Sequence, residues 1–354
     1  MSAERVVGDR MSPAGALPRE DVPCDICRVD EAAFVCEASS LYAEETFRIV
    51  RCRRCGLVYV NPRQAEAAKL AQLASLSGCS AVEERQERDV SVYQVALDCL
   101  EAHGRRGSLL DVGAATGGLL REARDRGWQV TGVEAAKPLA AFAEKTYGLS
   151  VFPGTLEEAG FPEASFDAVV MVHTIEHLYH PSRAVAEVFR VLKSGGSFYS
   201  MTPDFHHYAV RVAQCVGLLQ EADRIDPTAH PYYFTPTTHA TLVRRQGFRV
   251  VWCGSPISGL FARRNGGDGW ARSLLRVGVP PVVWLSRFAP IGSTVQCLAQ
   301  KPVVGKFDGA CRCATPPSSP RRTIAVVGCG RPGAPAPRHP SHVPITQKPT
   351  EWMA

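Results

Sequence analysis

A short apolar strand that ends in an acid and runs into small residues constrains this chain more than any other segment. Residues 109–117 read Leu-Leu-Asp-Val-Gly-Ala-Ala-Thr-Gly, and residues 118–126 then have the apolar spacing of a helix. Small residues at a strand-to-helix turn let a ligand approach the backbone closely. The segment therefore predicts the first strand of an α/β fold and a ligand-binding turn behind it.

The acid at the end of this strand, Asp111, selects among the ligands that such a turn binds. A dinucleotide would place its pyrophosphate at the helix N-terminus, where a carboxylate repels it. A ligand that bears an ammonium and a sulfonium but no phosphate is attracted instead, and S-adenosylmethionine is such a ligand. The next strand also ends in an acid, Glu134. A carboxylate at the tip of the second strand can accept hydrogen bonds from a ribose.

The order of the remaining elements predicts a doubly wound, Rossmann-like α/β sheet. Residues 165–172 form an apolar run of the kind found in buried parallel strands. A helix over 181–192 and a strand over 197–201 follow, and 247–252 and 294–299 read as the last two strands.

At this point residues 107–302 resemble a class I S-adenosylmethionine-dependent methyltransferase. The resemblance rests on six pieces that follow one another in the right order. They are Leu-Asp-Val-Gly-Ala-Ala-Thr-Gly, Val-Thr-Gly-Val-Glu, Ser-Phe-Asp-Ala-Val-Val-Met, His-Thr-Ile-Glu-His-Leu, Arg-Val-Leu-Lys-Ser-Gly-Gly and Met-Thr-Pro-Asp.

The resemblance implies that S-adenosylmethionine is the cofactor and that it contacts the glycine-rich turn and the strand ends. The implied cofactor-binding residues are Asp111, Gly113, Ala115, Gly117, Glu134, Thr155, Leu156 and Val172. One of them departs from the family pattern, because Ala115 replaces the middle glycine. Alanine still permits close approach if its φ is negative.

Two pairs of cysteines in the N-terminal third predict a structural zinc site. Cys24 and Cys27 form one Cys-x2-Cys pair, and Cys52 and Cys55 form a second pair with the same spacing further along the chain. Four thiolates in this layout suit tetrahedral zinc and leave no open position for chemistry. Four unmetallated thiols or two disulfides are the alternative. Residues 21–62 also resemble the small zinc ribbons that precede the methyltransferase domain in many bacterial enzymes of this superfamily.

Composition suggests how the rest of the chain is organised. We expect a disordered N-terminus over 1–20, a helical connector that caps the cofactor over 63–106, and a disordered tail over 303–354. The tail holds nine of the 26 prolines, and its seven lysines or arginines and two acids account for the whole formal charge of +5. The formally neutral body argues against a nucleic-acid substrate, which usually needs a basic face.

The pattern His-x-x-Glu-His at 173–177 has three interpretations. On a sustained helix it could hold the zinc of a metalloprotease, but here it follows a strand and is interrupted by Pro181. It also resembles the Glu-x-x-Glu-His element by which small-RNA 2′-O-methyltransferases hold magnesium, with His173 in place of the first glutamate. Magnesium prefers oxygen ligands. We favour the third interpretation, in which Glu176 and His177 bond local backbone and shape the pocket floor.

Methyl transfer to a hydroxyl or phenol is helped by a base that removes the proton, and histidine titrates near neutral pH. The candidates are His173, His177, His206, His207 and His230. We expect His173 to be the catalytic base, with His206 as the second choice.

These observations predict a cytoplasmic enzyme that methylates oxygen or carbon of a small-molecule, sugar or lipid-like acceptor. The alternatives are an RNA 2′-O-methyltransferase and a non-catalytic zinc-ribbon scaffold with a vestigial cofactor fold. Thirteen cysteines without a signal-peptide core favour a reducing compartment. The sequence contains no apolar run long enough to form a transmembrane span. The acceptor and the oligomeric state stay open at this level.

Overall fold

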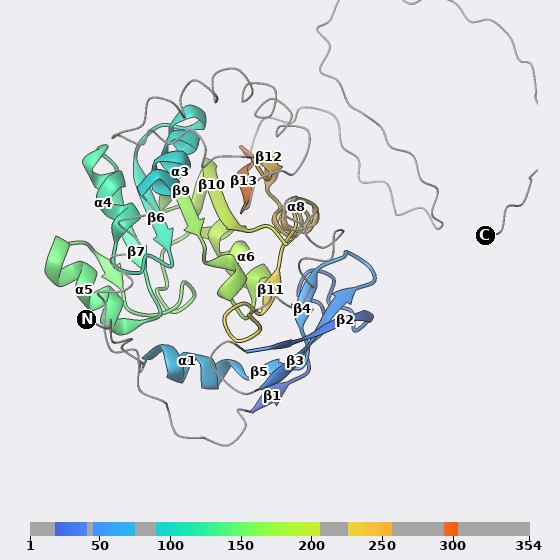
Figure 1. The fold of residues 1–354 in the computed structure, drawn as a ribbon. Coiled ribbons are helices and arrows are strands. Elements are labelled where there is room, and N and C mark those ends of the chain that lie inside the picture. Colours follow the sequence, from blue (N-terminus) through green and yellow to red (C-terminus); the bar gives the residue numbers. More distant parts are fainter. Residues whose placement is uncertain (1–17, 41–44, 75–89, 206–225, 257–293, 304–354) are drawn as a thin grey trace, which may run out of the picture. The chain divides into compact units, whose positions relative to one another are not determined.

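The computed structural model describes residues 18–40, 45–74, 90–205, 226–256 and 294–303, all of which belong to one compact unit over 1–306 (Figure 1). Most of the segments expected to be disordered, 1–20 and 303–354, lie outside the described residues, as does the aromatic-rich stretch 257–293. No helix in the described part combines the length and the apolar character that crossing a membrane requires.

A seven-stranded sheet forms the centre of the fold, and its order is β12-β13-β10-β9-β6-β7-β8. The strands are β6 (Ser108–Val112), β7 (Gln129–Val133), β8 (Val151–Phe152), β9 (Phe166–Val172), β10 (Leu192–Pro203), β12 (Arg249–Gly254) and β13 (Thr294–Gln300). Strands β6 to β10 run parallel, whereas β13 lies antiparallel between β10 and β12. The predicted α/β class is confirmed, and the antiparallel edge is a feature that the sequence pattern did not indicate.

The chain changes direction across the sheet at β6. It proceeds from β6 to β7 and β8 on one side and then returns to place β9 on the other side of β6. Open α/β sheets bind ligands outside the carboxyl ends of the strands at such a switch point. The fold therefore places a candidate site at the ends of β6, β7 and β9.

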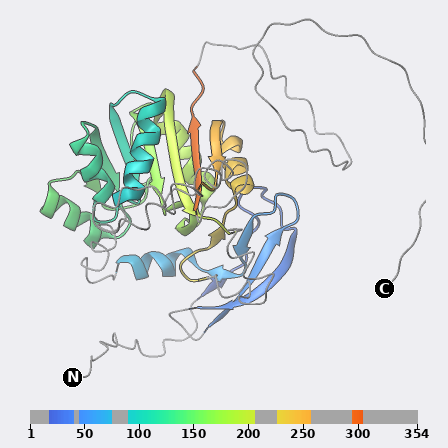
Figure 2. The same cartoon turned by 45° about the horizontal axis from the view of Figure 1, so that its top comes forward.

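Helices cover both faces of this sheet, as the views in Figures 1 and 2 show. Helices α3 (Val90–His103), α4 (Gly118–Asp125) and α5 (Lys137–Tyr147) pack on the face that buries Leu109 and Val170. Helices α6 (Pro181–Val191) and α8 (Pro236–Arg245) pack on the opposite face with Leu110 and Val169. Neighbouring strand residues point to opposite faces, so a strand covered on both sides is apolar along its length, as predicted for 165–172.

A second, four-stranded antiparallel sheet belongs to the N-terminal region. It contains β2 (Ala32–Ser39), β3 (Thr46–Cys52), β4 (Val58–Val60) and, at its edge, β11 (Tyr232–Tyr233) from far along the chain. A short pair, β1 (Arg19–Glu20) with β5 (Arg63–Gln64), leads into helix α1 (Glu66–Ala74). The predicted connector 63–106 thus begins with a strand, continues as α1 and α3, and between them lies outside the described residues.

The N-terminal sheet and the central sheet share one buried apolar cluster. Cys24, Leu57 and Tyr59 of the N-terminal region pack in the same cluster as Ile175 and Phe234. The division at residue 62 that composition suggests stays a prediction. In the structure, the N-terminal sheet is completed by β11 and shares its core with the rest of the fold.

Candidate functional site

The turn between β6 and α4 is shaped by two glycines in the left-handed region. Gly113 has φ +82°, and a Cβ there would lie 2.4 Å from Thr174 Oγ1. Gly117 has φ +87°, and a Cβ there would lie 2.5 Å from Leu149 Cδ1. The turn therefore requires glycine at both positions, because a side chain would be strained and would also clash.

Ala115, between these glycines, does not meet the expectation of a negative φ. Its φ is +47°, in the left-handed region that costs a non-glycine residue about 1–2 kcal/mol. The strained conformation turns the Ala115 backbone N–H toward Glu134, and it donates a hydrogen bond to Glu134 Oε2 at 2.9 Å.

Asp111 and Glu134 lie at the ends of the neighbouring parallel strands β6 and β7, where Asp111 is opposite Gly132. The Glu134 carboxylate is held by the Ala115 N–H and by the Ala136 N–H, which donates to Oε1 at 2.8 Å. Burial, and then the charge of Glu134, raise the pKa of Asp111 to about 8. Burial raises the pKa of Glu134 as well, although its two backbone donors and the charge of His177 oppose the rise. Two buried carboxylates in proximity favour a cationic ligand.

The other predicted cofactor residues lie on the strand and turn that follow. Val172 ends β9 and is half-buried. Leu156 is buried and belongs to the same apolar cluster as Val133, the last residue of β7. The Thr155 N–H donates to Glu158 Oε2 at 2.8 Å, and Thr155 Oγ1 accepts a bond from the Glu158 N–H at 3.2 Å. These bonds fix the turn that carries Leu156.

The segment 173–177 forms a short 3-10 helix, Ile175–His177, directly after β9. The sustained helix that a His-x-x-Glu-His metalloprotease needs is therefore absent at this pattern. His173 precedes the helix with φ +53°, and its N–H donates to the Met201 carbonyl at 2.8 Å. A non-glycine residue held in the left-handed region is a recurring feature of functional sites.

His173 and Glu176 form a close pair within this segment. His173 Nδ1 lies 3.4 Å from Glu176 Oε1, and the His173 side chain is 31% exposed whereas that of Glu176 is 3% exposed. Burial raises the pKa of Glu176, but His173 and His177 outweigh it, so its pKa lies below the usual range. An ionised carboxylate beside one imidazole nitrogen can orient that ring and leave the other nitrogen to accept a proton.

A third group joins this pair from another part of the chain. The rings of His177 and His230 have centroids 4.7 Å apart, and His177 Nδ1 is 2.8 Å from the Ala229 carbonyl oxygen. Glu176, His177 and His230 together bring potential metal-ligand atoms within 4.8 Å of one another. From sequence, His230 was one of several candidate histidines with nothing to connect it to 173–177. His206 and His207, which were also candidates, lie outside the described residues.

The four predicted zinc-binding cysteines also lie together, with one ligand atom from each within 4.8 Å of the others. Each pair lies in a tight turn, in which the Arg28 N–H donates to the Cys24 carbonyl and the Gly56 N–H donates to the Cys52 carbonyl. Burial and the neighbouring thiols raise the pKa of Cys27 to about 11. None of the described cysteines forms a disulfide. The donor set therefore fits zinc, which would displace the thiol protons on binding.

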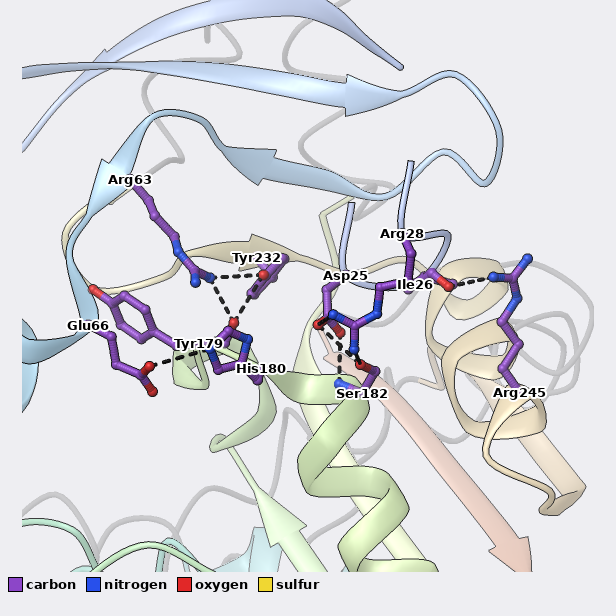
Figure 3. Close-up of polar contacts among 10 residues, drawn as sticks. All are labelled: Asp25, Ile26, Arg28, Arg63, Glu66, Tyr179, His180, Ser182, Tyr232 and Arg245. Carbon is purple, nitrogen blue, oxygen red and sulfur yellow. Dashed lines mark hydrogen bonds and ion pairs between the residues drawn. The ribbon is translucent and has the colours of Figure 1, made fainter. Parts of the chain in front are cut away.

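The N-terminal region contacts the segments that carry the candidate catalytic residues (Figure 3). The buried Arg63 guanidinium donates to the Tyr179 carbonyl at 2.7 Å and to the Tyr232 hydroxyl at 2.9 Å. Arg245 of α8 donates to the Ile26 carbonyl in the first cysteine turn. These bonds fix both the chain that follows 173–177 and the chain that follows His230.

Comparison with known proteins agrees with this geometry. Residues 84–252 match the family model of a methyltransferase domain. A probable S-adenosylmethionine-dependent methyltransferase of Mycolicibacterium smegmatis is 36% identical over 83 residues, which cover 20% of this chain and 32% of that protein. The demethylmenaquinone methyltransferase of Tropheryma whipplei is 26% identical over 157 residues, which cover 41% of this chain and 65% of that protein.

A solved structure of an S-adenosylmethionine-dependent methyltransferase from Thermotoga maritima also matches. Its TM-score is 0.43 at 23% identity, and the match covers 63% of this chain and 97% of that one. The chain spans less than two thirds of the length of the curated relatives it matches. The family match assigns residues 84–252 to a methyltransferase domain of the S-adenosylmethionine-dependent class.

Proposed function

We propose that this protein transfers a methyl group from S-adenosylmethionine to oxygen or carbon of a small-molecule, sugar or lipid-like acceptor. The observation that carries the proposal is the pair of buried carboxylates, Asp111 and Glu134, at the ends of adjacent parallel strands beside a glycine-shaped turn. A ligand with two cationic groups and no phosphate satisfies both acids.

When bound, S-adenosylmethionine supplies an electrophilic methyl carbon whose sulfur departs with the electron pair. Asp111 would compensate the cationic part of this molecule from within the fold. Glu134 would accept hydrogen bonds from the ribose hydroxyls, as a carboxylate at the tip of the second strand can do. Gly113 and Gly117 would let the molecule approach the backbone of the turn.

His173 would accept the proton of an acceptor hydroxyl. Its Nδ1 faces the buried Glu176 carboxylate at 3.4 Å, which favours the tautomer with the proton on Nδ1 and a basic Nε2. The remaining contribution of the protein is to align the acceptor oxygen with the methyl carbon. His206 remains a second candidate for the base.

The four clustered cysteines would bind one structural zinc ion and stabilise the N-terminal sheet. Thiolate ligands of this kind persist in a reducing compartment, which is consistent with a cytoplasmic protein. A lipid-like acceptor is supported by the similarity to a demethylmenaquinone methyltransferase, whose match covers 41% of this chain.

Isothermal titration of the full chain with S-adenosylmethionine tests the proposal. We expect saturable binding by the native protein and a loss of about 1–3 kcal/mol of binding free energy in Glu134→Ala, because a charge-assisted contact disappears. The exposed Glu157→Ala is the matched control and should bind as the native protein does. Absence of binding, or equal affinity in all three proteins, would contradict the assignment.

A further inference from the structure

We propose that Glu176, His177 and His230 form a second metal site, selective for a divalent transition-metal ion. The juxtaposition of these groups is a property of the tertiary structure. Glu176 and His177 belong to the 3-10 helix after β9, and His230 lies much later in the chain, in the turn before β11. One potential ligand atom from each lies within 4.8 Å of the others, close enough for a single ion to bridge them after small side-chain rotations.

The strongest support is the state of the Glu176 carboxylate. Glu176 is 2% exposed, and neither of its oxygens makes a hydrogen bond with any described residue. The nearest polar group, His173 Nδ1 at 3.4 Å from Oε1, lies at ion-pair distance without hydrogen-bond geometry. Buried polar groups in folded proteins are normally satisfied, and an isolated buried carboxylate is costly. A cation beside Glu176 would satisfy it.

The two histidines are oriented for this role. His177 Nδ1 is 2.8 Å from the Ala229 carbonyl oxygen, so Nδ1 carries the proton and Nε2 has a free lone pair. Metal-binding histidines commonly donate their other ring nitrogen to a carbonyl in this way. The turn that carries His230 is fixed by Asp226, whose Oδ1 accepts bonds from the N–H and hydroxyl of Thr228 at 3.2 and 2.8 Å.

The donor set indicates which ions the site accepts. Two imidazoles and one carboxylate suit zinc, cobalt, manganese or iron, whereas magnesium and calcium favour sets made only of oxygen. Three protein ligands also leave coordination positions open, and His177, at the exposed edge of the cluster, leaves the site accessible.

The position of the cluster connects it with methyl transfer, and this part of the inference depends on the proposed function. His177 is near enough to Glu134 for its charge to lower the pKa of that carboxyl group. An ion held by Glu176 would therefore lie beside the cofactor pocket, where an open position can bind the acceptor oxygen and stabilise its anionic form. His173 would then receive the proton that leaves this oxygen.

Cobalt(II) titration of the full, metal-depleted chain under reducing conditions tests the site without relying on activity. We expect two equivalents to bind. The cysteine cluster should produce thiolate-to-cobalt charge-transfer absorption, and the second equivalent should add ligand-field absorption alone. Glu176→Gln and His230→Gln should each weaken only the second equivalent by at least about tenfold.

His180→Gln is the matched control, because His180 pairs with a glutamate, Glu66, at 3.3 Å without belonging to the cluster. It should bind both equivalents, and retention of the charge-transfer band in every variant shows that the fold is intact. Binding of one equivalent by the native chain, or equal second-site affinity in all variants, would overturn the proposal. A failure of the proposed function alone would appear as a normal second cobalt equivalent without S-adenosylmethionine binding.

Discussion

The carboxylate of Asp25, in the first cysteine turn, accepts two hydrogen bonds from Ser182 at the start of α6. The Ser182 N–H donates to Oδ2 at 2.7 Å, and its hydroxyl donates to Oδ1 at 3.1 Å (Figure 3). Both residues are buried. A negative charge at a helix N-terminus is stabilising, and here that charge comes from a residue far earlier in the chain. The cysteine turn is thereby bonded to the helix that follows the candidate catalytic segment.

Replacement of Asp25 by alanine should destabilise the fold. The Ser182 N–H and hydroxyl would both lose their buried acceptor, and we expect the free energy of unfolding to fall by about 1–3 kcal/mol. Chemical denaturation measures this loss. Asp30→Ala, an exposed aspartate in the same turn region, is the control and should change the free energy of unfolding by less than about 0.5 kcal/mol. Equal stability of the two variants would show that the Asp25 bonds contribute nothing.

Substitution of His173 by asparagine tests the base. Asparagine tolerates the left-handed backbone at this position, so the substitution removes the imidazole with little added strain. We expect kcat to fall by about 10²–10⁴-fold, the usual effect of losing a general base, while the affinity for S-adenosylmethionine is unchanged. Steady-state kinetics and calorimetry separate the two effects. An unchanged kcat would assign catalysis to positioning alone.

Binding of S-adenosylmethionine should depend on pH through Asp111. Because burial raises the pKa of Asp111 to about 8, the carboxyl group binds a proton more tightly in the folded protein than in the unfolded chain. This contribution to stability is fully present below about pH 4 and is lost as the pH rises through about 8. A cationic ligand needs the ionised form, so affinity should increase between about pH 6 and pH 8 with proton release.

Calorimetry in buffers of different ionisation enthalpy measures that proton release directly. Asp111→Asn cannot ionise, so it should bind more weakly and lose most of the pH dependence over this range. If the native protein and Asp111→Asn have the same pH profile, then Asp111 does not face the cofactor.

The packing of Gly113 against Thr174 predicts a coupled pair of substitutions. Gly113→Ala places a Cβ 2.4 Å from Thr174 Oγ1 and also strains the backbone at φ +82°, so we expect a loss of about 2–4 kcal/mol in unfolding free energy. Adding Thr174→Ala removes the clash but not the strain, and it should restore about half of the loss. A double-mutant cycle by denaturation measures the coupling. Additive effects would show that the contact is unimportant.

The elements that local pattern specifies were predictable from the sequence. Apolar runs and small-residue turns predicted the strands near 109, 129, 166 and 197, and the structure places β6, β7, β9 and β10 there. The expected φ of Ala115 was wrong, because the bond from its N–H to Glu134 favours a left-handed backbone that no local preference for alanine indicates. Strand β11 was missed because two residues carry no periodic signal, and their pairing with β4 depends on the assembled fold.

By itself the sequence determined the chemistry available to this protein: a turn for a phosphate-free cation, two cysteine pairs, and a histidine beside a glutamate. Spacing along the chain carries that information, because strand ends and metal-binding turns are local features. Only the tertiary structure decided which of these groups meet. It brought His230 to Glu176 and His177, and it bonded Asp25 to Ser182. Contacts between distant segments depend on how apolar faces pack, so no local pattern specifies them.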